Sequence, residues 1–205
     1  MRIGIFGGTF DPPHIGHLIL TDEARFQLNL DQVWWLLTPI PPHKLSLDIT
    51  PVTDRLEMVE AALIDQDRFE ISYVDINRSP PYYAFDTMRI LRDQYPYFQF
   101  IYLIGGDSLK DLPTWHEPIE FIRTCDEIGV MSRSGYDVDV TELEQELPGL
   151  AERIRIIHAP LIEISSSQIR QRIENGLPFR NFLPAEVYRT ILAKGLYSSS
   201  SQLNE

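Results

Sequence analysis

The sequence predicts an α/β fold in which a doubly wound, mostly parallel sheet carries helices on both faces. Short apolar runs of strand character alternate with longer segments of helical periodicity along most of the chain. This alternation is typical of strand–helix–strand units, which place parallel strands in one sheet and cover it with helices. A glycine pair also joins the first apolar run to the first helical segment, as in sheets that bind ligands at the carboxyl ends of their strands.

Six apolar segments are expected to form the sheet, and helical patterns lie between them. The strands are predicted at residues 3–6, 33–38, 69–74, 98–104, 127–131 and 154–158. Helices are predicted at residues 15–28, 52–64, 86–95, 119–124 and 141–147, then from 165–167 to 176 and from 184 to 194. We therefore expect a Rossmann-like sheet whose polar motifs, although far apart in sequence, converge just beyond the strand ends.

Cap signals support several of these helices. Thr50 followed by Pro51 is typical of an N-cap with proline at the first helical position. Thr141 and Glu144 have the spacing of a capping box. Gly195 directly follows the last helical pattern, as a C-terminal glycine does.

Composition restricts the class of protein. The 205 residues are 43% hydrophobic and 23% charged, which fits a single domain over residues 1–197 and a polar, disordered tail over 198–205. The net charge of −12 argues against a broad nucleic-acid or anionic-membrane surface. Cys125 is the only cysteine and no apolar stretch reaches membrane-spanning length, so we expect a cytoplasmic protein without disulfides.

The first chemical motif follows the first strand and runs from Gly7 through Gly8 to His14 and His17. A glycine turn lets backbone N–H groups approach an anion, and the helix start adds partial positive charge. The two imidazoles share a helical face, where they could bind phosphate oxygens, and a protonated one would offset developing charge. The alternative is a tight turn with two structural histidines. No cysteine or carboxylate cluster completes a zinc site, and neither G-x-G-x-x-G nor a Walker lysine is present.

The second motif is Ile164-Ser165-Ser166-Ser167-Gln168-Ile169-Arg170. Ser165 and Gln168 have capping-box spacing, and capping alone would explain the segment in isolation. Hydroxyls, exposed amides and Arg170 at a helix start also form an anion site. Phosphoryl transfer needs such distributed positive potential, because the protein contributes little covalent chemistry.

The two motifs together resemble the nucleotidyltransferase superfamily with the H-x-G-H and I-S-S-[ST]-x-[IV]-R signatures. Further segments at residues 40–44, 83–88, 104–109, 112–116 and 195–197 resemble bacterial nicotinate-nucleotide adenylyltransferases, and the similarity covers nearly the whole chain. This resemblance implies transfer of AMP from ATP to nicotinic acid mononucleotide, giving nicotinic acid adenine dinucleotide and pyrophosphate in NAD biosynthesis. It also implies Mg²⁺, bound mainly through the ATP phosphates, and no direct protein ligand for the metal is predicted.

The resemblance assigns roles to individual residues on the ATP side. The ATP phosphates would be held by Gly8, Thr9, Phe10, His14 and His17, with His17 closest to the α-phosphorus. Gly105 and Asp107 would contact the ribose side of ATP, and Arg133 would contact the nucleotide. Ser166, Ser167 and Arg170 would bind the leaving β- and γ-phosphates, and Ile164 is a further ATP-binding residue. The catalytic set is His14, His17 and Arg170.

On the acceptor side, Lys44 would reach the mononucleotide phosphate and Trp115 would stack on the pyridine ring. Tyr83 and Ala84 would bind the ring carboxylate with their backbone amides. Ala84 replaces the usual threonine, and His116 stands where many relatives have tyrosine. Nicotinamide mononucleotide therefore stays open as the preferred acceptor.

Three other classes remain to be distinguished. Phosphopantetheine is the acceptor in a related, shorter family that lacks the segments around Lys44 and Trp115. A nucleotide-binding regulator without catalysis would bind ATP but transfer nothing, and a structural partner protein would not bind ATP. Aminoacyl-tRNA synthetases share a related histidine motif, but this chain is too short and too acidic for them. The oligomeric state is not predicted.

Overall fold

The computed structural model describes residues 1–40, 49–133, 140–160 and 162–198, apart from the side chains of residues 132 and 133. Its sheet has the strand order β3-β2-β1-β4-β5-β6, and every neighbouring pair is parallel. The strands are β1 (Arg2–Gly8), β2 (Gln32–Leu37), β3 (Phe69–Ser72), β4 (Gln99–Gly105), β5 (Glu127–Arg133) and β6 (Ile154–Ala159). All six overlap the predicted segments, and the strand order reverses between β1 and β4, where such sheets bind ligands.

The helices follow the predicted pattern, with additional short turns. The α-helices are α1 (Ile15–Gln27), α2 (Val52–Leu63), α3 (Ala84–Gln94), α4 (Gly106–Asp111), α5 (Pro118–Thr124), α6 (Thr141–Glu146), α7 (Leu150–Arg153), α8 (Ser166–Glu174) and α9 (Ala185–Lys194). The 3₁₀ turns within the described ranges are η2 (Leu112–Thr114) and η3 (Arg180–Phe182). The short α4, α7, η2 and η3 were not predicted, since single helical turns leave too few residues for a periodic pattern. None of the helices among these residues has the length and apolar character needed to span a membrane.

Two of the predicted caps are wrong. Pro51 has extended backbone angles and occupies the N-cap position of α2, so the cap is Pro51 rather than Thr50, while the helix begins at Val52 as the periodic pattern predicted. Val140 is the N-cap of α6, and the Glu144 carboxylate accepts hydrogen bonds from the backbone N–H groups of Gly149 and Ala151 at 2.7 Å each. The C-terminal glycine is confirmed, because Gly195 ends α9 with φ 62°.

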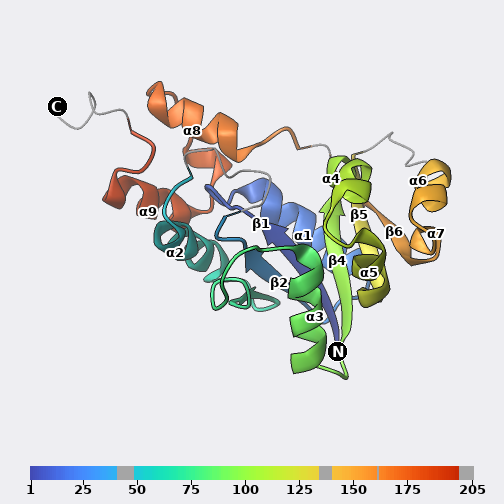
Figure 1. The fold of residues 1–205 in the computed structure, drawn as a ribbon. Coiled ribbons are helices and arrows are strands. Elements are labelled where there is room, and N and C mark those ends of the chain that lie inside the picture. The colour runs from blue at the N-terminus through green and yellow to red at the C-terminus, as the bar shows by residue number, and fades with distance from the viewer. Residues whose placement is uncertain (41–48, 134–139, 161, 199–205) are drawn as a thin grey trace.

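The sheet is covered on both faces, as predicted (Figure 1). Ile3 and Ile5 of β1 belong to a core cluster with residues of α3 and α5. Phe6 points the other way and belongs to a second cluster with residues of α1 and α2. Side chains of a strand alternate between faces, so the strands of one sheet supply both cores. Cys125 is fully buried in the first cluster.

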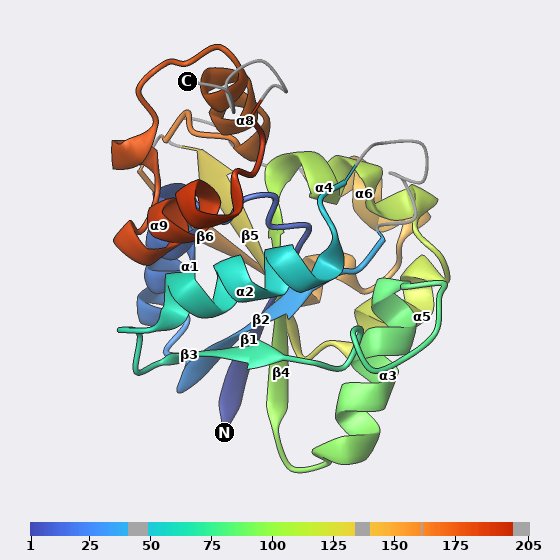
Figure 2. The ribbon, with the colours of Figure 1, turned by 90° about the vertical axis from the view of Figure 1, so that its left-hand side faces the viewer.

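A third apolar cluster fixes the two C-terminal helices. Met58 of α2 packs with Ile169 of α8 and with Val187 and Ile191 of α9. Figure 2 shows α9 against α2, with α8 at the same end of the molecule. This packing brings the start of α8 to the loop between β1 and α1.

Candidate active site

The shape of the loop after β1 depends on Phe10, whose side chain turns back into the core. Phe10 has a φ of 48°, unusual for a bulky residue, and its side chain is only 3% exposed. Its ring stacks on Trp35 at a centroid distance of 4.9 Å. A Cβ at Gly8 would lie 2.8 Å from the Phe10 ring, so only glycine fits beneath it. The side chain of Phe10 is thus part of the core, and the backbone is the part of this residue suited to meet a ligand.

His14 and His17 form a stacked pair at the start of α1. Their ring centroids are 3.6 Å apart with an interplanar angle of 18°. His17 Nδ1 accepts the backbone N–H of His14 at 3.1 Å, so the neutral His17 ring carries its proton on Nε2. His14 is 5% exposed, and its Nδ1 has no hydrogen-bond partner among the described residues. A Cβ at Gly16 would lie 3.0 Å from this nitrogen, which explains the glycine between the histidines.

Burial sets the charge of this pair. Burial lowers the pKa of His14 to about 4. The pKa of His17 lies well below its ordinary value, first because of burial and second because of His14. Both imidazoles are therefore neutral at pH 7 in the ligand-free protein. They present N–H donors to an anion, whereas the sequence suggested that one could be protonated.

The start of α8 meets this loop directly. The Ser165 hydroxyl accepts the N–H of Gln168 at 3.2 Å, and the Gln168 amide oxygen accepts the N–H of Ser165, which confirms the predicted capping box. The Ser166 hydroxyl donates to the carbonyl oxygen of Pro12 at 2.8 Å, across 154 sequence positions.

Arg170 makes the second contact between the two motifs. Its Nη1 donates to the carbonyl oxygen of Asp11 at 2.6 Å, and its Nη2 lies 3.4 Å from the hydroxyl of Ser167. Ile164 is partly buried beside the third core cluster. The predicted convergence of the two motifs is therefore confirmed.

Sequence reasoning missed a buried polar network beneath the loop. Asp11 is 5% exposed, and its carboxylate accepts the Tyr197 hydroxyl at 2.6 Å and the Thr50 N–H at 3.3 Å. Arg55 of α2 is 1% exposed and also contacts the loop. One signal was available, because Arg55 lies one helical turn before Met58 and Val59, in the apolar stripe of α2.

Two predicted acceptor residues lie together on the other side of the switch point. Tyr83 is the N-cap of α3 and its ring stacks on His116 at 4.1 Å; Ala84 is the first helical residue. Trp115 is partly buried, and its ring centroid lies 5.2 Å from that of Phe121.

A buried ion pair that the sequence did not reveal holds this helix start. Arg78 pairs with Asp75 at 2.8 Å and donates to the carbonyl oxygen of Tyr83 at 3.3 Å. The Thr87 hydroxyl also donates to Asp75 at 2.8 Å. Burial raises the pKa of the Asp75 carboxyl, while the hydrogen bonds from Arg78 and Thr87 lower it.

The remaining predicted residues are only partly described. Gly105 ends β4 beside β1, and a Cβ there would meet nothing within 4 Å, so the space above it is open. Asp107 is exposed in the first turn of α4. Arg133 is the last residue of β5, but its side chain is outside the described part of the chain, and so is Lys44.

Comparison with known proteins places the chain in a family. A family model described as cytidylyltransferase-like matches residues 5–172. A relative from Thermomicrobium roseum, named "Probable nicotinate-nucleotide adenylyltransferase", is 42% identical over 196 residues, covering 96% of this chain and 91% of the relative. One of the same name from Exiguobacterium sibiricum is 40% identical over 199 residues, or 97% and 100% of the two chains. The chain belongs to the nicotinate-nucleotide adenylyltransferase family.

Solved structures agree with this membership at the level of the fold. The Plasmodium falciparum nicotinic acid mononucleotide adenylyltransferase, described as complexed with NaAD, superimposes with a TM-score of 0.76 at 18% identity, over 96% of this chain and 97% of that one. The resemblance to nicotinate-nucleotide adenylyltransferases inferred from the sequence is thus confirmed.

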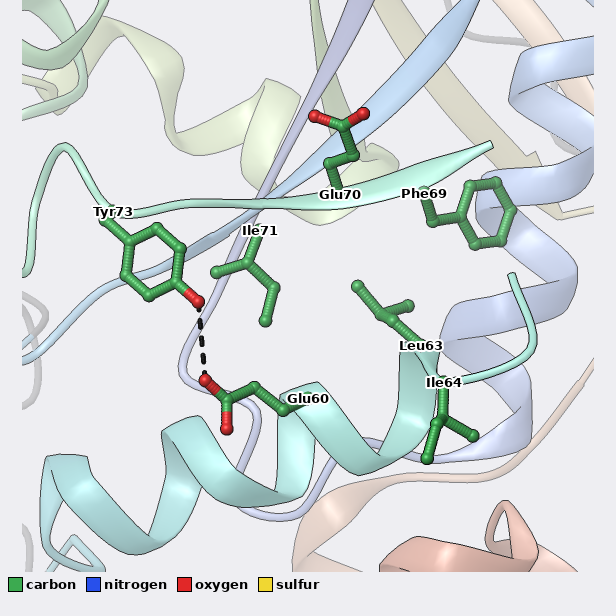
Figure 3. Close-up of a pocket in the computed structure, with 7 residues that line it drawn as sticks. All are labelled: Glu60, Leu63, Ile64, Phe69, Glu70, Ile71 and Tyr73. Carbon is green, nitrogen blue, oxygen red and sulfur yellow. Dashed lines mark hydrogen bonds between the residues drawn. The ribbon is translucent and has the colours of Figure 1, made fainter. Parts of the chain in front are cut away.

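A separate hollow lies between the outer edge of the sheet and α2 (Figure 3). It has a volume of about 360 Å³ and is lined by Glu60, Leu63, Ile64, Phe69, Glu70, Ile71 and Tyr73. The Tyr73 hydroxyl donates to the Glu60 carboxylate at 3.3 Å. Among the residues that the structure describes, two carboxylates and no basic side chain line this hollow, so it does not suit the phosphates of a nucleotide.

Proposed function

We infer that this member of the nicotinate-nucleotide adenylyltransferase family transfers AMP from ATP to nicotinic acid mononucleotide. The products are nicotinic acid adenine dinucleotide and pyrophosphate, and the step belongs to NAD biosynthesis. The observation that carries this proposal is the contact between the two motifs, in which α8 donates hydrogen bonds to the loop that leads into the His14–His17 pair.

The reaction is an in-line displacement at the α-phosphorus of ATP. A phosphate oxygen of the mononucleotide forms the new P–O bond, and the bond to the bridging oxygen breaks, so pyrophosphate leaves with the electron pair. No protein nucleophile is needed because the attacking group is already an anion. The protein must bring two anions together and stabilise the charge that spreads to the leaving group.

The neutral imidazoles and the loop backbone supply donors for this charge. His17 Nε2–H is directed by the hydrogen bond on its Nδ1, and binds the α-phosphate. The backbone at Gly8, Thr9 and Phe10 and the His14 ring complete the donor set. Ser167 and Arg170 bind the leaving phosphates, while Ser166 holds the loop through Pro12. Ile164 and Arg133 border the nucleotide, and Gly105 and Asp107 meet its ribose.

Mg²⁺ bound through the ATP phosphates would offset part of their negative charge. No group of three or more His, Cys, Asp or Glu in the described ranges could hold a metal ion. Phosphate oxygens and water suit Mg²⁺, which keeps much of its hydration shell. The enzyme works in the cytoplasm, consistent with a lone cysteine that is buried rather than bonded.

On the acceptor side, Trp115 stacks on the pyridine ring, and the backbone at Tyr83 and Ala84 binds the ring carboxylate. His116 supports this wall by stacking on Tyr83. Lys44 binds the mononucleotide phosphate. The methyl group of Ala84 offers no hydroxyl to the carboxylate, so the preference for the acid over the amide depends on backbone donors.

Pyrophosphate release from ATP tests the function with three acceptors in parallel: nicotinic acid mononucleotide, nicotinamide mononucleotide and phosphopantetheine. We expect turnover with the first, weaker turnover with the second and none with the third. Release with phosphopantetheine alone would reassign the acceptor, and ATP binding without release would indicate a regulator. Preference for the amide would overturn the acceptor assignment but not the reaction.

A further inference from the structure

Arg55 is a fully buried guanidinium that, among the described residues, donates hydrogen bonds only to backbone carbonyl oxygens. Its four hydrogen bonds go to carbonyl oxygens of Thr50 (2.8 Å), Thr9 (2.8 Å), Thr38 (3.0 Å) and Pro39 (2.5 Å). No carboxylate in the described part of the chain forms an ion pair with it. Removing a charge from water is costly, and the four carbonyl oxygens offset that cost by accepting hydrogen bonds from the guanidinium.

The four carbonyls come from three segments that meet at the carboxyl end of the sheet. Thr9 follows β1, Thr38 and Pro39 follow β2, and Thr50 precedes α2. Burial lowers the pKa of Arg55, while Asp11 and Tyr197 raise it. The guanidinium remains charged because its ordinary pKa is so high. It therefore joins the loop that approaches the ATP phosphates to the neighbouring strand end and to α2.

The bond to Thr9 also determines where the next N–H points. In a trans peptide the C=O and the N–H lie in one plane and point in opposite directions. Because the Thr9 oxygen is directed to the buried Arg55, the N–H of Phe10 points away from Arg55. The positive φ of Phe10 and the stacking of its ring on Trp35 fix the conformation of Phe10, which follows this peptide bond.

We propose that Arg55 is a positioning residue for adenylyl transfer: it holds the Thr9–Phe10 peptide in the orientation that presents the Phe10 N–H to an ATP phosphate. The proposal rests on the proposed function, since it assumes that this loop binds a triphosphate. Arginine is required because its planar group offers five N–H donors in fixed directions, whereas lysine has three on a single nitrogen.

Arg92 provides a matched control at the opposite end of the sheet. It donates to the carbonyl oxygens of Thr124 (2.9 Å) and Phe98 (3.0 Å) and pairs with Asp126 at 2.5 Å. These acceptors precede β5 and β4, away from the phosphate loop. Arg92→Lys therefore disturbs a comparable set of hydrogen bonds from an arginine to backbone carbonyl oxygens, and it leaves the phosphate loop unchanged.

The experiment compares wild type, Arg55→Lys, Arg55→Gln and Arg92→Lys, each shown to be folded at the assay temperature by thermal unfolding. Wild-type turnover with ATP and nicotinic acid mononucleotide tests the proposed function first and independently. We then expect kcat/KM for ATP to fall roughly 10- to 100-fold in Arg55→Lys, as small misplacements of binding groups do. In Arg92→Lys it should stay within about twofold while stability falls.

A second measurement does not depend on turnover. In the wild type and in Arg92→Lys, ATP should shift the Phe10 amide resonance in a ¹⁵N–¹H spectrum, and in Arg55→Lys this shift should be lost. Equal effects of Arg55→Lys and Arg92→Lys on kcat/KM, or an unchanged Phe10 shift in Arg55→Lys, would overturn the proposal. If neither Arg55 variant folds while Arg92→Lys does, the guanidinium serves folding alone and the proposal is equally wrong.

Discussion

The starts of α1 and α8 lie at the same end of the sheet, but they are completed differently. In α8, the Ser165 hydroxyl and the Gln168 side chain satisfy each other's backbone N–H groups. In α1, His14 and His17 are also placed as a capping box and His17 Nδ1 accepts the N–H of His14, but the buried Nδ1 of His14 makes no hydrogen bond among the described residues. Buried polar atoms are rarely left unpaired without a reason. The comparison suggests that α8 is a finished structural end that holds the loop, whereas α1 keeps its donors for a ligand.

The largest expected effect comes from His17. His17→Asn keeps an oxygen near the position of Nδ1, so the cap on His14 survives, but it removes the Nε2–H. We expect kcat to fall about 10²- to 10³-fold, the usual cost of losing one donor to developing charge. KM for ATP should change much less, because the contact strengthens in the transition state. Steady-state kinetics and the melting temperature check this, with His17→Ala as the variant that loses both contacts. Equal losses in kcat and ATP affinity would mean that His17 contributes only uniform binding.

The second test concerns the neutral state of the pair. The folded pKa of His14 is about 4, below the ordinary value of 6.5, so the unfolded chain binds the proton more readily. His14 therefore contributes its full share of stability above pH 6.5, and this share is lost as the pH falls toward 4. We expect His14→Asn to remove up to about 3 kcal/mol of this pH dependence. Denaturant unfolding of both proteins at pH 7, 6, 5 and 4 measures it, and parallel curves would contradict it.

Arg170 tests the other side of the comparison. Arg170→Ala removes a charged donor from the start of α8 and its bond to Asp11. We expect kcat/KM for ATP to fall about 10- to 100-fold, the range for losing a hydrogen bond to a charged group. Arg172 is the control on the same helix, because its Nε donates to the carbonyl oxygen of Pro178, at the far end of α8. Arg172→Ala should leave this value within about twofold. Similar losses in both variants would remove any special role of Arg170.

Most of the fold could be read from the sequence because its signals are periodic. Six apolar runs and seven helical patterns predicted the sheet and the main helices. The glycine pair before α1 and the serines at the start of α8 indicated where these two helices begin. The N-cap at Thr50 was missed by one position because Pro51 adopts extended angles outside the helix. A single turn such as α4 has no period to detect, so its existence depends on packing at the end of β4.

The residues of the candidate site also fall into those that the sequence identified and those that it did not. Residues whose proposed roles depend on their own chemistry, such as His14, His17 and Arg170, could be identified from the sequence. The buried residues that hold the site in place could not be identified from the sequence, because their contacts depend on the folded chain. Arg55 binds carbonyl oxygens from three segments, and Asp75 pairs with Arg78 beneath the start of α3. Only the folded chain shows which backbone oxygens a buried arginine can reach.

The smallest effect should distinguish capping from ligand binding at α8. Ser165→Ala removes the side-chain cap and should lower the free energy of unfolding by about 1 kcal/mol, while Ser165→Asn should stay within a few tenths, since asparagine is an equally good N-cap. Because Ser166 and Arg170 make the contacts to the loop, kcat/KM for ATP should remain near the wild-type value in both variants. A large loss of turnover in Ser165→Asn, at unchanged stability, would show that this hydroxyl also meets the ligand. The end of α8 would then be as open to the nucleotide as that of α1, and the contrast between the two helix starts would disappear.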